Sequence, residues 1–141
     1  MEKKPIPRKG RKTVLIVDDH LLVRQLIADV LAHRDGYNVL MAETGQQGLQ
    51  QAREFKGEIH LLLTDFQMPG MSGIELATAM TLDRPKLKVL MMSAFPGGML
   101  ILNEGWHFLP KPFIASQLRT LVAGLLSPDS KSRFAPPEST E

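Results

Sequence analysis

The sequence predicts an α/β fold in which helices cover both faces of a parallel β-sheet. Short apolar runs alternate with amphipathic segments along residues 13–126, a pattern typical of βαβ units. The runs are continuously apolar, as expected for strands that are buried on both faces. The length of 141 residues corresponds to one domain with a single buried core.

Five apolar runs are expected to form the strands, at residues 13–17, 37–41, 59–64, 88–92 and 107–110. The first helix is expected at about 20–34, where helical spacing places five apolar residues on one stripe: Val23, Leu26, Ile27, Val30 and Leu31. The second helix is expected at about 45–55, where Thr44 and Gln47 have the spacing of a capping box. The third is expected to begin at Ser72, with Glu75 in the same relation.

The sequence supports the fifth helix more strongly than the fourth. The segment between Ser93 and Trp106 contains Pro96-Gly97-Gly98, which break helices and leave room for a turn or two at most. We therefore expect helix 4 to be shortened. The fifth helix is expected at about 114–126, with an apolar inner face formed by Ile114, Leu118, Leu121, Val122 and Leu125.

The charge of the chain is concentrated at its start. Residues 1–12 hold six of the seventeen Lys and Arg residues, and the rest of the chain has a net charge of −3. We expect a basic disordered leader at 1–12, a folded domain at 13–126 without nucleic-acid binding, and a disordered Pro/Ser-rich tail at 127–141. The sequence contains no cysteine, no secretory signal and no apolar run of membrane-spanning length, which fits a cytoplasmic protein.

Polar groups follow four of the expected strands. Asp18 and Asp19 follow the first strand, Asp65 the third, Ser93 the fourth and Lys111 the fifth. Open α/β sheets carry their sites at the carboxyl ends of the strands, so we expect these five groups to converge on one crevice.

The residue types indicate phosphate chemistry with a divalent cation. Three carboxylates in a small volume repel one another unless a cation joins them, and oxygen ligands favour Mg²⁺ or Mn²⁺. Lys111 lies between two prolines and is placed to reach a carboxylate or its phosphoryl adduct. No histidine is placed to activate Ser93, which we interpret as a hydrogen-bond donor to a phosphoryl oxygen. All four histidines are interpreted as structural: His20, His33, His60 and His107.

Four motifs resemble those of the receiver domain of two-component response regulators. They are Val-Asp-Asp-His after the first strand, Leu-Thr-Asp-Phe-Gln-Met-Pro-Gly-Met-Ser-Gly-Ile-Glu-Leu after the third, Met-Ser-Ala after the fourth and Phe-Leu-Pro-Lys-Pro-Phe after the fifth. The resemblance covers about residues 13–126. It implies a flavodoxin-like, doubly wound five-stranded sheet of order 2-1-3-4-5 with five helices, in a bacterial phosphorelay protein that is a phosphoacceptor switch rather than an enzyme.

The resemblance also implies a role for each site residue. Asp65 would accept a phosphoryl group from a phosphohistidine of a sensor kinase or phosphotransfer protein. Mg²⁺ would be held by Asp19, Asp65 and the backbone carbonyl of Gln67, with Asp18 acting through water. Lys111 and Ser93 would bind phosphoryl oxygens. Two further residues match family positions: the small Ala94, which leaves access for the phosphoryl group, and the aromatic switch residue Phe108.

Three departures from the family pattern fall on one face. Helix 4 is reduced, Ile114 stands where a capping residue is expected, and Phe108 lacks the hydroxyl of tyrosine. All three touch the helix 4–strand 5–helix 5 face, through which the family usually contacts a downstream protein or a second copy. The output route is therefore expected to be non-standard.

Other readings are weaker. A haloacid-dehalogenase-type phosphatase needs Asp-x-Asp, which Asp18-Asp19-His20 does not provide, and a flavodoxin needs a phosphate loop where this chain has carboxylates. No Walker loop is present, which argues against ATP as donor. A phosphorylation-independent docking module that keeps the receiver fold stays open as an alternative, as do a stand-alone receiver and a piece of a longer regulator or hybrid kinase.

Overall fold

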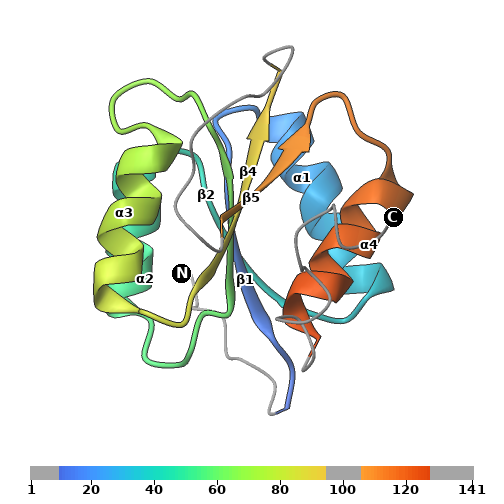
Figure 1. The fold of residues 1–141 in the computed structure, drawn as a ribbon, viewed down its shortest axis with the longest axis horizontal. Helices are drawn as coiled ribbons and strands as arrows, with labels where there is room; N and C mark the ends of the chain where they lie inside the picture. The colour runs from blue at the N-terminus through green and yellow to red at the C-terminus, as the bar shows by residue number, and fades with distance from the viewer. Residues whose placement is uncertain (1–9, 95–105, 128–141) are drawn as a thin grey trace, which may run out of the picture.

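A computed structural model describes residues 10–94 and 106–127 as a parallel sheet between two layers of helices (Figure 1). The strand order is β2-β1-β3-β4-β5, which confirms the expected order and fold class. Each strand lies within two residues of its expected bounds. The strands are β1 (Thr13–Val17), β2 (Asn38–Ala42), β3 (Leu61–Asp65), β4 (Lys88–Ser93) and β5 (Trp106–Pro110).

The helices form two pairs (Figure 1). One face of the sheet carries α1 (Leu21–Ala28), which continues as the π-helical η1 (Asp29–Arg34), together with α4 (Ala115–Leu126). The other face carries α2 (Gly45–Glu54) and α3 (Gly73–Asp83). The expected shortened helix 4, most of the basic leader and most of the C-terminal tail lie outside the described residues. Within the described ranges, none of the helices has the length and apolar character to cross a membrane.

Two apolar cores lie on opposite faces of the sheet because successive strand side chains alternate between the faces. The core under α1 and α4 contains Val14 and Ile16 of β1 and Leu61 and Leu63 of β3. The core under α2 and α3 contains the residues between them, such as Leu15 and Val17 of β1 and Leu62 of β3. All residues of β1 and β3 are buried, so these central strands form a fixed support for the groups at their carboxyl ends.

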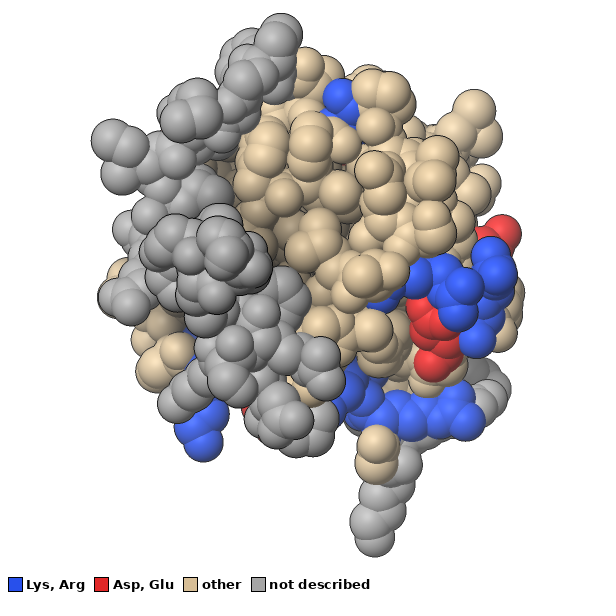
Figure 2. All heavy atoms as spheres, turned by 45° about the vertical axis from the view of Figure 1, so that its right-hand side comes forward, with Lys and Arg blue, Asp and Glu red and all other residues tan. Residues whose placement is uncertain are grey.

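Two residues assigned to inner helix faces are exposed instead. Leu26 is 57% exposed, because it is rotated by about 100° from the buried Ile27 and falls outside the stripe that faces the sheet. Ile114 is 65% exposed, because it precedes α4 in an extended conformation and does not share the helical face. Figure 2 shows a broad area without charged side chains on the α1–α4 side of the molecule.

The predicted caps of two helices are confirmed. The Thr44 hydroxyl accepts a hydrogen bond from the Gln47 backbone N–H at 3.0 Å. Ser72 and Glu75 form the reciprocal pair of a capping box, with distances of 3.1 Å and 2.9 Å. Both caps fix the chain where it leaves a strand end and enters a helix.

Gly73, the first residue of α3, lies directly against the end of β3. Its backbone N–H donates to the Phe66 carbonyl at 2.9 Å. A Cβ atom at this position would overlap the backbone oxygen of Asp65 and lie 3.1 Å from Cα of Phe66. Since both neighbours are backbone atoms, they cannot move aside as a flexible side chain could. The close approach of α3 to Asp65 therefore requires glycine.

We predict that Gly73→Ala destabilises the domain by about 1–3 kcal/mol, the usual cost of overpacking a tightly packed position. Urea unfolding should show a lower midpoint with an unchanged slope. Thr78→Ala, an exposed substitution on the same helix, is the matched control and should change stability by less than about 0.5 kcal/mol. Equal stability of Gly73→Ala and wild type would contradict the close packing of α3 on the β3 end.

Candidate functional site

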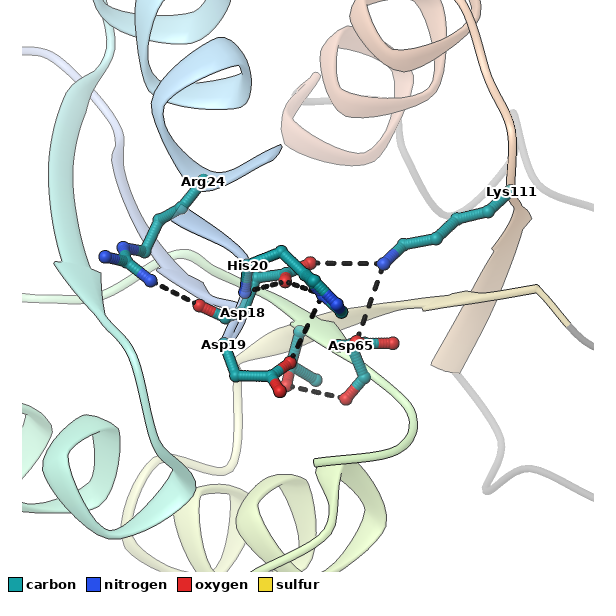
Figure 3. Close-up of polar contacts among 7 residues, drawn as sticks. Asp18, Asp19, His20, Arg24, Asp65 and Lys111 are labelled. Carbon is teal, nitrogen blue, oxygen red and sulfur yellow. Dashed lines mark hydrogen bonds and ion pairs between the residues drawn. The ribbon is translucent and has the colours of Figure 1, made fainter. Parts of the chain in front are cut away.

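The five predicted polar groups lie at the same edge of the sheet. Asp18 and Asp19 follow β1, Asp65 ends β3, Ser93 ends β4 and Lys111 follows β5. By strand alternation, Asp18, Asp65 and Lys111 are directed to the α1–α4 side, as are the core residues two positions before each of them. Figure 3 shows these three side chains pointing toward one another.

Lys111 joins the two buried carboxylates. Its Nζ lies 3.2 Å from Asp18 Oδ2 and 3.5 Å from Asp65 Oδ2. The backbone N–H of Lys111 donates to the Ser93 carbonyl at 2.7 Å, which holds the turn after β5 against the end of β4. The Lys111–Pro112 peptide bond is cis. The expected contact between Lys111 and Asp65 is thus confirmed.

The carboxylates of Asp18, Asp19 and Asp65 form one cluster, in which ligand atoms lie within 4.8 Å of one another. Burial raises the pKa of Asp65, the Lys111 ammonium opposes this shift, and the neighbouring Asp18 and Asp19 carboxylates add to it. The cluster contains three carboxylates and the Lys111 ammonium carries only one positive charge, so Lys111 alone does not balance the cluster. The donor set consists of hard oxygen atoms and fits a divalent cation such as Mg²⁺.

The structure places His20 in the cluster, although its sequence position suggested a structural role. Its Nδ1 lies 3.3 Å from Asp18 Oδ1 and 3.4 Å from Asp19 Oδ1. The side chain is 67% exposed and does not cap α1. Its backbone N–H donates to Asp18 Oδ1 at 2.8 Å. The signal in the sequence was its position directly after the two aspartates, where the chain turns into the helix.

Arg24 is a second residue that the sequence reasoning missed. Its guanidinium donates to the backbone carbonyl of Asp18 at 2.6 Å and lies 4.0 Å from the Glu43 carboxylate. Arg24 lies one helical turn after His20, so its side chain reaches back over the start of α1. It fixes the backbone from which the two aspartates project.

The other predicted residues surround this cluster. Ser93 is buried at the end of β4, and Ala94 follows it as an exposed residue. Gln67 is exposed in the turn after β3. Phe108 of β5 is half-buried and packs against the core under α2 and α3. The remaining histidines lie outside the cluster; for example, His60 Nδ1 accepts the Thr13 backbone N–H at 3.0 Å.

Comparison with known proteins places this arrangement in a family. The model of the response regulator receiver domain matches residues 14–123. The sensor kinase CckA of Brucella abortus is 33% identical over 121 residues, which are 83% of this chain and 13% of that kinase. Sporulation initiation phosphotransferase F of Bacillus subtilis is 31% identical over 115 residues, which cover 77% of this chain and 89% of that protein.

The solved structures agree with the sequence comparison. The crystal structure of the receiver domain from the hybrid histidine kinase CckA has a TM-score of 0.73 and 33% identity, and the match covers 82% of this chain and 99% of that chain. The chain spans less than two thirds of the length of the first curated relatives that it matches. With the family model, the strand order and the strand-end cluster in agreement, the chain belongs to the response regulator receiver domain family.

Proposed function

We propose that this receiver domain accepts a phosphoryl group on Asp65 from a phosphohistidine of a sensor kinase or phosphotransfer protein. The observation that carries the proposal is the buried Asp65 carboxylate, held 3.5 Å from the Lys111 ammonium beside two further carboxylates. The proposed location is the cytoplasm, where histidine-linked donors of this kind would be accessible.

The chemistry requires one nucleophile and compensation of charge on the transferred group. A carboxylate oxygen of Asp65 attacks the phosphorus atom, the phosphorus–nitrogen bond breaks, and its electron pair returns to the donor imidazole. The Lys111 ammonium attracts the equatorial phosphoryl oxygens, and the Ser93 hydroxyl donates a hydrogen bond to one of them. The product is an aspartyl phosphate, and its hydrolysis resets the switch.

A divalent cation is part of the proposal. Asp19, Asp65 and the backbone carbonyl of Gln67 would hold Mg²⁺ directly, and Asp18 would hold it through water. When bound, Mg²⁺ offsets the charge of the carboxylates and of the phosphoryl oxygens. The presence of three carboxylates beside a single ammonium supports this assignment, because a cluster with excess negative charge favours binding of a cation.

The donor protein is proposed to dock beside α1. Leu22 and Leu26 of α1 and Ile114 before α4 are exposed large apolar residues. Leu22 lies two residues from His20, so a protein bound there would reach Asp65. Downstream, the phosphoryl group would act through Ser93 and Phe108 on a protein contact at the helix 4–strand 5–helix 5 face, either with another protein or with a second copy. Ala94 would leave the entry to Asp65 open.

We predict that acetyl phosphate with Mg²⁺ adds one phosphoryl group to the wild-type protein and none to Asp65→Asn, measured by intact mass. Asp83→Asn is the control, because Asp83 is an exposed residue paired with Arg53 away from the cluster. Labelling of Asp65→Asn at the wild-type rate would refute Asp65 as the acceptor. A wild-type protein that folds but takes no phosphoryl group, even from phosphorylated histidine proteins, would favour the phosphorylation-independent docking module.

We predict that Asp19→Asn lowers Mg²⁺ affinity by about tenfold or more and slows phosphorylation in parallel, because one of the proposed direct carboxylate ligands is lost. Titration calorimetry measures the affinity and intact mass follows the labelling. Asp29→Asn, an exposed substitution at the first residue of η1 and outside the cluster, should leave both unchanged. Full labelling of wild type in excess chelator would contradict the metal requirement.

We predict that Asp65 lowers the stability of the metal-free domain at neutral pH. Since the folded-state pKa of Asp65 is raised, the folded protein holds its proton more tightly than the unfolded chain does. Stability is therefore lost as pH rises from the ordinary pKa of aspartate through the raised value. Urea unfolding in chelator should show that Asp65→Asn becomes more stable relative to wild type as pH rises across this window. This difference in the free energy of unfolding should shrink when Mg²⁺ is added. A stability difference that is constant with pH would contradict the raised pKa.

A further inference from the structure

His20 is the one imidazole inside the carboxylate cluster of the described residues. The His20 side chain is largely exposed, whereas the Asp18 side chain beside it is fully buried. Figure 3 shows the ring directed toward the same small region as the carboxylates of Asp19 and Asp65. A nitrogen ligand atom and three carboxylates therefore meet in one place, at the end of β1 and the start of α1.

The distances are compatible with shared ligation of one ion. His20 Nδ1 lies 3.3 Å from Asp18 Oδ1, with which it forms a long hydrogen bond, and 3.4 Å from Asp19 Oδ1. Neighbouring ligand atoms of an octahedral cation with bonds of about 2.1 Å are separated by about 3 Å. For a slightly larger ion the separation increases toward the observed values. The ring is thus spaced from Asp19, a proposed direct ligand, as a second ligand of the same ion would be.

Neither the apolar core nor the cap of α1 depends on the His20 side chain. It is 67% exposed, and it does not cap α1, so its position is not required by the core or by the helix. The backbone N–H of His20 is fixed by Asp18 Oδ1 at 2.8 Å, which holds the base of the side chain in place next to the carboxylates.

We propose that His20 is a metal-selectivity residue whose imidazole Nδ1 supplies a nitrogen ligand to the divalent cation of this site. The inference rests on the proposed metal site and adds a ligand to it. Imidazole suits Mn²⁺ acceptably and Co²⁺, Ni²⁺ and Zn²⁺ well, whereas Mg²⁺ favours oxygen ligands and water. His20 therefore shifts the selectivity of the site toward transition-metal ions and contributes little to Mg²⁺ affinity.

The direct test is pulsed electron paramagnetic resonance of the untagged full chain with Mn²⁺ bound. The wild-type protein should show the ¹⁴N coupling of a coordinated imidazole, and His20→Ala should lose it. His33→Ala is the matched control, because His33 is an exposed histidine that pairs with Asp29 outside the cluster. This variant should keep the coupling.

Affinities provide a second readout. His20→Ala should weaken Ni²⁺ binding by about tenfold or more and change Mg²⁺ binding by less than about twofold. Bound Mn²⁺ that requires Asp19 but shows no imidazole coupling would overturn the role of His20 and leave the proposed function intact. Wild-type protein that binds no Mn²⁺ or Mg²⁺ in an Asp19-dependent way would instead overturn the proposed metal site, and the role of His20 with it.

Discussion

An imbalance of charge at the carboxyl edge of the sheet shapes the whole site. Three carboxylates meet there, and the Lys111 ammonium reaches only two of them, at 3.2 Å and 3.5 Å. Asp18 is fully buried and is satisfied by Lys111 and the His20 backbone N–H, whereas Asp65 keeps a raised pKa. Three carboxylates beside one ammonium leave excess negative charge in the cluster, and in the proposed function this charge favours a cation and then a phosphoryl group bound through it.

The fold supports this imbalance because the groups start from rigid elements. Strands β1 and β3 lie in the centre of the sheet and are buried along their whole length, so Asp18 and Asp65 cannot separate without moving both cores. Gly73 packs against the backbone of Asp65 and Phe66 at the end of β3. After β1, the Arg24 guanidinium donates a hydrogen bond to the Asp18 carbonyl. The repulsion among the carboxylates is thus resisted by packing and by backbone hydrogen bonds.

The sequence predicted the sheet and the strand-end groups because both follow from short-range patterns. Continuous apolar runs mark the buried strands, and polar residues at their ends have only one edge of the sheet to occupy. Side chains that depend on rotation about a helix axis were harder to place. Leu26 belongs to the apolar spacing of α1 but lies outside its buried stripe, and Ile114 leaves the face of α4 because the chain is still extended there.

The two residues that sequence reasoning missed share a physical reason. The roles of His20 and Arg24 depend on how the chain turns from β1 into α1, and adjacent residues at such a turn do not follow the alternation of a strand. The turn brings His20 back over the carboxylates and lets Arg24 reach the Asp18 carbonyl at 2.6 Å. Inside a helix or strand, the sequence pattern indicates which face a residue occupies. At this junction, backbone hydrogen bonds determine where the side chains lie.

The position of the site at the boundary between the two cores explains how a phosphoryl group on Asp65 could be sensed elsewhere. Asp65 and Lys111 belong by alternation to the α1–α4 side, whereas Ser93 follows Met91 on the α2–α3 side. Phe108 packs on that second side and pairs with Met91 across β4 and β5. In the proposed function, a phosphoryl group that attracts the Ser93 hydroxyl pulls on the strand whose neighbour carries Phe108. In this proposal, the charge on one face of the sheet would be coupled to aromatic packing on the other.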